Sequence, residues 1–527
     1  MAHMLRVTHH LGFGLMLGAA LALSVGCTNY RDPNGDEEAD TALTLGTGDS
    51  TESGSDTGGG CESDADCADH PNGPICDEAT NECFLECEPG DTGQCYDGPL
   101  ATQGVGLCAG GSRTCSAAGL WGTCLGQTLP GAELCGNDID EDCDGTLVDI
   151  DQDGDGWGTC DGDCCDDELL GCIDAHLANP GAFEIVGNEV DDDCDGMTDE
   201  QEPTCDAELA SDSSDPLDFA AAMDLCQTTS EAAPLPTRTW GVISATLTLA
   251  NGEDTPMPVQ HSIRASFGDA IEPSGGDTLA VLSSGHAAAV GQTNPDFAEF
   301  EFGQEIGTTV PAPADWIAAN GGEFPASCEG VNPTPGTDAN DSVMLTLRVR
   351  VPTNARSFTT RMFFFSAEYP EWVCSEFNDF FVTLIDSAAV DNPADKNIAI
   401  YDDGEDVWPV GLNILKTAPG LFRVCESGFV GCQGDLAAEM YECTDGPELL
   451  AGTGFDAIDN TNSCNGNEFP VGGGTGWLEM SGNVEPGEIM DIRFAIWDAG
   501  GHAFDALVLL DDWRWSLDAA APGVSTP

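Results

Sequence analysis

Residues 343–351 read VMLTLRVRV, so apolar side chains alternate with largely polar ones. This period of two predicts a half-buried β-strand, and residues 490–496, MDIRFAI, repeat the pattern. Further strand candidates, separated by Gly, Pro and Asn turns, lie at 240–249, 361–365, 379–385 and 504–510. The region contains no convincing long amphipathic helix. We therefore predict a β-sandwich or jelly-roll-like domain over residues 238–518.

The charge of the chain excludes two classes of partner. Its 527 residues include 94 Asp+Glu against 14 Lys+Arg, for a formal net charge of −80. Nucleic-acid binding needs a basic face, and docking on anionic lipid head groups needs clustered cations, so we expect neither. Because 41% of the residues are hydrophobic, the chain is not simply a disordered acidic tail.

The N-terminus predicts export and a lipid anchor. Residues 1–26 have a positive start and a short apolar run, as signal peptides do. They end in LSVG before Cys27, which resembles a bacterial lipobox although Ser24 stands where Leu is usual. Lipidated Cys27 and the following Thr28 would place the protein on the outer membrane or cell surface. The alternative is ordinary cleavage nearby, which would leave Cys27 as a free thiol.

The next two segments are predicted to be a tether and a disulfide module. Residues 27–60 contain few apolar side chains and should form a disordered, lipid-anchored linker. Excluding Cys27, 24 of the 25 cysteines remain, which allows twelve disulfides in an oxidising space. Nine of them fall within residues 61–127, where disulfides would replace a hydrophobic core. Zinc is the competing use, since Cys83 and Cys87 have a zinc-like spacing.

An acidic repeat occupies residues 128–206, before a predicted linker at 207–237. Residues 136–145 read GNDIDEDCDG and residues 187–196 read GNEVDDDCDG, 51 positions further on. Pro-Gly-Ala precedes both copies, but Cys135 precedes the first where Val186 precedes the second. The two copies therefore cannot have identical disulfide arrangements.

Between the copies lies the start of a calcium loop. From Asp151 the chain reads DQDGDG, with carboxylates at positions 1, 3 and 5 and Gly at position 6. An EF-hand would place Glu at position 12, where this chain has Gly162. Asp161 or Asp163 could close a shorter loop instead, so the segment is similar to a calcium loop without being an EF-hand.

The crowding of carboxylates in this region favours the interpretation that it binds a metal. No Lys or Arg lies between Arg113 and Arg238, and two carboxylates about 4 Å apart repel by about 1 kcal/mol even in water. Carboxylate and carbonyl oxygens suit Ca²⁺, with another divalent metal or an empty acidic spacer as alternatives. The predicted ligands are Asn137, Asp140, Asp142, Asp144, Asp149, Asp151, Asp153, Asp155, Asp161, Asp163, Asn188, Asp191, Asp193 and Asp195.

Two family resemblances extend this interpretation. Residues 130–202 resemble the MopE-type metal-binding repeats of bacterial surface proteins, which implies metal binding. Residues 250–515 resemble the choice-of-anchor L domain of exported proteins, whose surface attachment varies among members. The motifs are LSSG at 282–285, FSAEYPEWV at 365–373, FNDFF at 377–381 and FAIWDAG at 494–500. Gly501 departs from that family, which often has an acidic residue at this point.

The C-terminal region contains a second set of candidate cation ligands. They are oxygen-bearing side chains expected on loops at strand ends, and the alternative is that they cap turns. Cys374, between two of the motifs, is expected to form a disulfide. The candidates are Glu368, Glu371, Asn378, Asp379, Asp498 and Asp505.

The search for catalytic motifs is negative. The chain lacks the zinc motif HExxH and the phosphate-binding GK[ST], and Ser283 and Ser284 lack the Gly two positions earlier that a nucleophile elbow requires. We predict a non-enzymatic surface lipoprotein whose calcium-stabilised stalk presents a β-sandwich to an extracellular protein or glycan. The alternatives are a polysaccharide-acting hydrolase and a coat protein without a specific ligand.

Overall fold

The computed structural model describes most of the chain from residue 61 onward and divides it between Glu86 and Cys87 into two compact units. The predicted signal peptide, Cys27, the tether and Asp149 lie outside the described residues. The described ranges are 61, 63–67, 72–77, 79–131, 134, 137, 139–145, 151–166, 174–201, 204–301, 306–326, 328, 331, 334–402, 404, 406–418, 420–434, 436–459 and 461–527.

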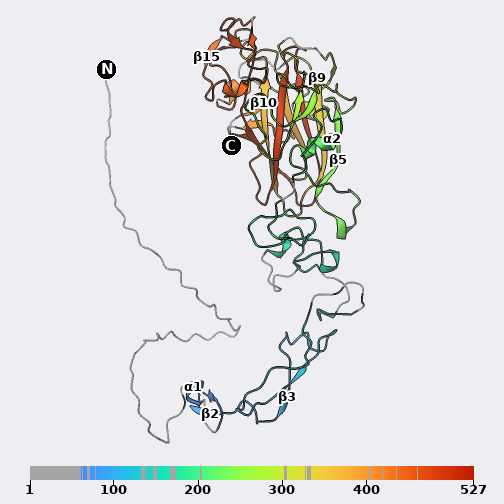
Figure 1. Ribbon diagram of the computed structural model, residues 1–527, viewed down its shortest axis with the longest axis vertical. Coiled ribbons are helices and arrows are strands. Elements are labelled where there is room, and N and C mark those ends of the chain that lie inside the picture. Colours follow the sequence, from blue (N-terminus) through green and yellow to red (C-terminus); the bar gives the residue numbers. More distant parts are fainter. Residues whose placement is uncertain are drawn as a thin grey trace, which may run out of the picture. The chain divides into compact units, whose positions relative to one another are not determined.

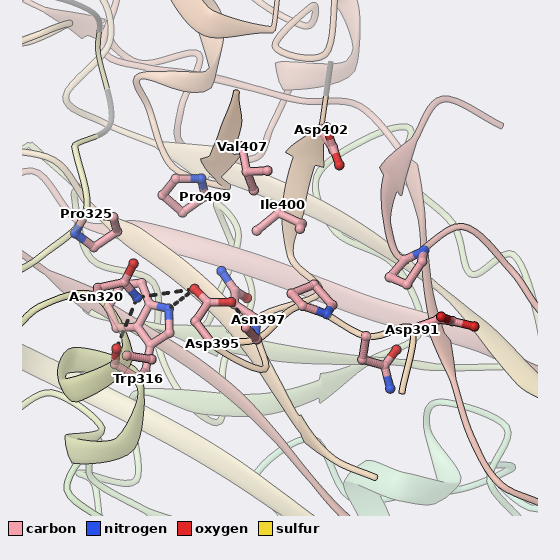
Figure 2. A pocket seen from close by; sticks show the side chains of 15 residues that line it. Trp316, Asn320, Pro325, Asp391, Asp395, Asn397, Ile400, Asp402, Val407 and Pro409 are labelled. Carbon is pink, nitrogen blue, oxygen red and sulfur yellow. Dashed lines mark hydrogen bonds between the residues drawn. The ribbon is translucent and has the colours of Figure 1, made fainter. Parts of the chain in front are cut away.

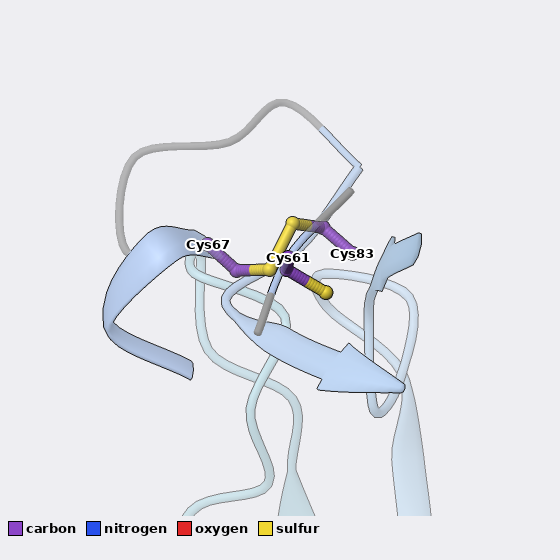
Figure 3. Close-up of side chains that lie close together, drawn as sticks. All are labelled: Cys61, Cys67 and Cys83. Atoms are coloured by element: carbon purple, nitrogen blue, oxygen red, sulfur yellow. A yellow bond between two sulfur atoms is a disulfide. The ribbon is translucent and has the colours of Figure 1, made fainter. Parts of the chain in front are cut away.

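In the first unit, cysteines take the place of a hydrophobic core. Helix α1 (Asp64–Cys67) precedes an antiparallel hairpin of β1 (Ile75–Asp77) and β2 (Glu82–Phe84). The disulfides Cys61–Cys76 and Cys67–Cys83 cross this small fold and form its buried cluster. Figure 3 shows the Cys67–Cys83 bond with Cys61 beside it. With so few apolar side chains available, these covalent links must supply the stability.

The second unit begins with another disulfide-linked hairpin, formed by β3 (Thr92–Cys95) and β4 (Gly111–Thr114). Disulfides Cys87–Cys115, Cys95–Cys124 and Cys108–Cys143 hold it. Because Cys83 and Cys87 are both oxidised, the zinc alternative is wrong and the disulfide prediction is confirmed.

The acidic repeats consist of turns with very little regular structure. Their described helices are the 3-10 turns η1 (Thr159–Asp161) and η3 (Ala175–Leu177). Cys143 of the first copy pairs with Cys108, whereas Cys194 of the second pairs with Cys164. The two copies therefore have different disulfide arrangements, as predicted.

A two-sheet β-sandwich forms the rest of the unit, which confirms the predicted fold class (Figure 1). Its five-stranded sheet has the order β11 (Phe380–Asp386), β20 (Ile489–Asp498), β9 (Asp338–Arg350), β5 (Gly241–Thr248), with β8 (Thr309–Pro311) also on β9. The seven-stranded sheet has the order β22 (Gly523–Ser525), β19 (Leu478–Asn483), β10 (Ser357–Ser366), β21 (Ala506–Ser516), β7 (Leu279–Ser283), β6 (His261–Arg264), with β18 (Gly473–Gly474) also on β10. All neighbours are antiparallel, and each of the six predicted strands overlaps one of these strands.

Short elements fill the connections. The hairpins are β12 (Ile400–Asp402) with β13 (Val407–Pro409), β14 (Gly428–Val430) with β15 (Glu439–Tyr441), and β16 (Ile458–Asp459) with β17 (Phe469–Pro470). The helices are α2 (Pro216–Ala221), η4 (Leu235–Thr237), α3 (Ala314–Ala319), α4 (Ile414–Thr417) and η5 (Glu448–Leu450). In the described part of the chain, no helix has the length and apolarity needed to cross a bilayer.

The sandwich is buried on more than its inner faces. One core lies between the sheets, and a second covers the outer face of the seven-stranded sheet around Phe363 and Phe365. A third, around Trp316 and Trp497, covers one end of the five-stranded sheet. The prediction of a half-buried strand is therefore wrong for the first part of β9, where Met344 packs into the third core. It fits the later part, where Thr346 and Arg348 are partly exposed.

Candidate metal centres

The calcium-like loop brings its carboxylates together. Oxygen atoms of Asp151, Asp153 and Asp155 lie within 4.8 Å of one another, and Asp153, Asp163 and Asp166 form a second group of the same size. Asp153 therefore belongs to both groups, and Asp166 is a member that the sequence did not suggest. Of the two residues proposed to close the loop, Asp163 reaches this cluster, while Asp161 lies in η1.

Glycine shapes the loop as the sequence pattern requires. The Asp151 carboxylate accepts hydrogen bonds from the N–H of Gly154 at 2.6 Å and of Gly156 at 2.9 Å. Both glycines have positive φ, 85° and 101°, a conformation that side-chain-bearing residues rarely adopt. The turn thereby folds back on its first carboxylate and leaves the alternate ones side by side.

Burial and mutual repulsion disfavour the charged form of these carboxylates. Burial, with repulsion from neighbouring aspartates, raises the pKa of Asp155 to about 6 and of Asp163 to about 7, although backbone N–H groups oppose the shift. The Oδ2 atoms of Asp153 and Asp163 are buried without a hydrogen-bond partner. A cation would satisfy these oxygens and remove the repulsion.

The two repeat copies fold in the same way. Asn137 and Asn188 each accept a hydrogen bond from the N–H two residues on, and each donates to an acidic side chain four residues on. Asp140 and Asp191 each accept from the N–H of the glycine five residues on, at 3.1 Å in both copies. Each asparagine therefore stabilises its loop with both its side-chain oxygen and its side-chain nitrogen.

Each copy also gathers carboxylates. In the first, oxygens of Asp140, Asp142 and Asp144 lie within 4.8 Å of one another. In the second, burial and repulsion from Asp195 raise the pKa of Asp193 to about 7, although the N–H of Asp195 donates to it at 3.1 Å. Both copies therefore concentrate negative charge on a braced loop.

The repeats join the sandwich through partly buried hydrogen bonds. Asn354, in the turn after β9, accepts from the N–H of Phe183 at 3.0 Å and donates to its carbonyl at 2.9 Å. The hydroxyl of Thr353 donates to Asn179 Oδ1 at 2.7 Å, and Asn179 donates in turn to Asp155 Oδ2 at 2.7 Å. A chain of contacts thus connects the calcium-like loop to the sandwich.

A second group of carboxylates lies at one end of the sandwich. Glu368 follows β10 and Asp505 precedes β21, and both strands belong to the seven-stranded sheet. Asp379 precedes β11 and Asp498 ends β20, both in the five-stranded sheet. We call Glu368, Asp379, Asp498 and Asp505 the inter-sheet cluster.

This cluster is almost completely buried. The exposed fractions are 3% for Glu368, 0% for Asp379 and Asp498, and 5% for Asp505. Burial raises the pKa of all four carboxyls well above the ordinary value, and repulsion within the group adds to the shift. Asp341 in β9, which the sequence did not suggest, contributes to that repulsion and pairs with His502 at 2.9 Å.

Two predicted ligands have different surroundings. Asn378 is buried beside the cluster, where its Oδ1 accepts from the N–H of Asn413 and its Nδ2 has no partner. Glu371 lies in another group, in which its carboxyl hydrogen-bonds to Asp459 and its pKa rises to about 7. Asp459 also hydrogen-bonds to Glu301, a contact that no local sequence signal could reveal. Cys374 forms a disulfide with Cys328, as predicted.

One cavity is separate from all of these carboxylates. It measures about 600 Å³ and lies beside α3, lined among others by Trp316, Asn320 and Asp395 (Figure 2). Asp395 accepts from the indole N–H of Trp316 at 3.1 Å and from Asn320 at 3.2 Å. Trp316 is completely buried, so it offers no stacking surface to a sugar ring.

Comparison with known proteins identifies one region. Residues 329–513 match the choice-of-anchor L domain, in agreement with the resemblance seen in the motifs. No curated protein and no solved structure matches the chain. The match, which contains the whole inter-sheet cluster, indicates an exported, surface-associated protein with a β-rich domain. It does not reach residues 130–202, so the metal-binding-repeat resemblance stays a prediction.

Proposed function

We propose that this protein is a non-enzymatic lipoprotein of the cell surface, anchored to the outer membrane through Cys27. Calcium-filled repeats would form a stalk that presents the β-sandwich to an extracellular protein or glycan. The observation that carries the proposal is the pair of identically braced repeat loops with the Asp151–Asp166 loop between them. The sequence contains no Lys or Arg between Arg113 and Arg238 that could neutralise these carboxylates from within the repeats.

Ligand chemistry favours calcium for the repeats. Carboxylate and backbone carbonyl oxygens are hard ligands, and Gly-rich loops can adopt the irregular geometry that Ca²⁺ accepts. The cysteines offer little to softer metals, because those with described pairings are oxidised. Extracellular calcium sites bind at about 10⁻⁴–10⁻³ M, so filling them outside the cell would order the loops.

The contacts of Asn354 and Thr353 support a stalk that is coupled to the sandwich. A disordered repeat could not keep Phe183 and Asn179 in place against the turn after β9. Calcium would thus fix the base of the sandwich as well as the loops that bind it.

The hydrolase alternative gains no support from the carboxylates. A glycosidase needs two carboxyl groups about 5–10 Å apart that can reach a sugar in an open cleft. Glu368 and Asp498 are buried, and neither lines any of the three described cavities. We therefore retain the non-enzymatic proposal.

Calorimetry of the full chain, with calcium and with chelator, tests the stalk. At tenfold excess over its dissociation constant, one site adds about 1.4 kcal/mol, so chelation should lower the first transition by several degrees. Asp153→Asn should lower it similarly in calcium. The matched control is Asp174→Asn, because Asp174 is exposed and asparagine tolerates its positive φ. Identical traces with and without chelator would contradict calcium binding by the repeats.

Three experiments test the rest of the proposal. Protease treatment of intact cells should release the sandwich, and Cys27→Ser should move the protein out of the membrane fraction. Incubation with extracellular polymers should retain the protein without raising reducing-end counts. Protection from protease, or new reducing ends, would contradict surface display or the non-enzymatic role respectively.

A further inference from the structure

We propose that the sandwich holds one hard divalent cation between its two sheets, bound by Glu368, Asp379, Asp498 and Asp505. The oxygen-only ligand set favours Ca²⁺. This site is independent of the repeats and goes beyond the function proposed for them. It would be a structural centre in the interior of the surface domain.

The sheet pairing places the ligands together. In the seven-stranded sheet, the last pair between β10 and β21 is Ser366 with Ala506. Glu368 and Asp505 lie next to this pair in the chain. Phe380 pairs with Trp497 at the corresponding end of the other sheet, next to Asp379 and Asp498. A cation at this point would therefore connect the two sheets, two ligands from each.

The second observation is a set of buried oxygens that have no hydrogen-bond partner. They are Glu368 Oε2, Asp379 Oδ1 and both carboxylate oxygens of Asp498. The hydroxyl of Ser284 lies near Asp498 and lowers the pKa of that carboxyl, against the larger raising effects of burial and of the neighbouring carboxylates. Buried polar groups are normally satisfied, and an unpaired buried carboxylate is very costly.

Protein groups do not supply the missing positive charge. Among the described residues, the one salt bridge near the cluster joins His502 to Asp341 rather than to any of the four carboxylates. Ser366 donates to Asp379 Oδ2 at 3.2 Å, which satisfies one oxygen of that group. The remaining partnerless oxygens face one another's negative charge.

Protonation alone does not account for this geometry. The carboxyls of Glu371 and Asp459, in the neighbouring group, are hydrogen-bonded to each other. A proton on Asp498, even if shared with the nearby Ser284 hydroxyl, would leave its other oxygen and the partnerless oxygens of Glu368 and Asp379 unsatisfied. A metal ion satisfies several such oxygens at once without direct contact between them.

A glycine makes room for the carboxylates. A Cβ on Gly285, just after β7, would lie 2.0 Å from Asp505 Oδ2 and 2.3 Å from its Cγ. The absence of a side chain at this position lets Asp505 approach the cluster. Gly501, in the loop after β20, is the matched comparison because a Cβ there would meet nothing closer than 3.6 Å.

Metal analysis of the full-length, disulfide-intact protein tests the proposal. After brief treatment with chelator to empty exposed sites, wild type and Asp153→Asn should each retain one calcium ion per chain. Asp498→Asn and Gly285→Ala should lose it, whereas Gly501→Ala should keep it. Because Asp153→Asn removes a repeat ligand only, failure of this proposal is distinguishable from failure of the stalk proposal.

The contrary outcomes are equally specific. A chelator-treated wild type without metal, with an unchanged melting temperature, would overturn the inter-sheet site. So would an Asp498→Asn variant that melts at or above the wild-type temperature, because a neutral isostere should be tolerated where a protonated carboxyl stands. If Asp498→Asn does not fold, the retained metal of wild type and Asp153→Asn decides the question.

Discussion

The repeats and the sandwich both contain many carboxylates, but they differ in what surrounds these groups. Every salt bridge between described residues lies between residues 231 and 514, where exposed acids such as Asp315 and Asp491 pair with arginine. The repeats contain no lysine or arginine of their own. Their carboxylates instead crowd together on disulfide-braced loops, partly in contact with water.

The comparison also separates two kinds of cation site. In the repeats, oxygens of Asp151 and Asp155 are near the surface, so an ion there should exchange readily with solvent. In the inter-sheet cluster the ligands are buried on both sheets, so an ion should leave only when the sandwich opens. Under the proposed function and the further inference, stability would depend on calcium concentration in the repeats and on the integrity of the core in the sandwich.

Reduction of the disulfides should give the largest difference in stability between residues 61–206 and the sandwich. Each disulfide contributes about 2–4 kcal/mol, and the module before the repeats has almost no other core. The sandwich retains three hydrophobic clusters after reduction. Limited proteolysis in reductant, followed by mass spectrometry, should leave a fragment from about Arg238 to the C-terminus. Protection of residues 61–206 in reductant would contradict this division.

Removal of calcium should make the stability of the repeats depend on pH. Asp155, Asp163 and Asp193 have raised pKa values in the folded state, about 6, 7 and 7, against 3.8 when unfolded. The folded state then binds more protons, so its stability is greatest below about pH 4 and falls as pH rises to about 7. Calorimetry in chelator should show higher melting at pH 5 than at pH 8.

Saturating calcium should abolish or reverse that pH difference, because calcium competes with protons for the same oxygens. The control is Asp163→Asn, which removes one of the titrating groups and should flatten the profile in chelator. A melting temperature in chelator that rises between pH 5 and pH 8 would contradict the raised pKa values.

Loss of Asn354 should have a moderate effect on the junction. Asn354→Ala leaves the partly buried N–H and C=O of Phe183 without their partner, at a cost of about 1–3 kcal/mol in the free energy of unfolding. Denaturant unfolding and protease sensitivity of the repeats would measure it. Asn251→Ala, which removes only a local turn contact to Glu253, should change stability much less. Equal effects would argue against coupling through the junction.

The smallest effect should come from an exposed ion pair of the sandwich. Glu231→Gln removes the 3.1 Å contact with Arg348, but Arg348 keeps Asp491 at 3.0 Å and both groups are exposed to water. Exposed pairs contribute little to stability because solvent screens them. The melting temperature should be unchanged within error, at low and at high salt. A large loss would show that surface pairing matters more than this comparison assumes.

Local patterns predicted the strands better than they predicted the sites. Alternation located β9 and β20 because sheet periodicity is written into consecutive residues. It could not show that Met344 would be covered on the outer face, because α3 arrives from another part of the chain. Disulfide pairing was equally inaccessible, since it depends on the three-dimensional path.

The candidate ligands show the same limit. Glu368 and Glu371 are three residues apart in one motif, yet they lie in different clusters of carboxyls. Glu368 interacts with Asp498, whereas Glu371 interacts with Asp459. Asp341 was missed because β9 begins at Asp338, five residues before the alternating pattern that predicted the strand, so nothing in the sequence placed Asp341 at the end of a sheet. The spacing of Asp151, Asp153 and Asp155 was informative because a short glycine-containing turn determines their geometry locally.

Elemental analysis of the full chain, purified from its native envelope in metal-free buffer without chelator, tests the central claim most directly. We predict more than one calcium ion per chain. Asp153→Asn should lose an ion from the repeats, and Asp498→Asn should lose the ion of the inter-sheet cluster. A chain that is folded, disulfide-bonded and free of divalent metal would contradict it.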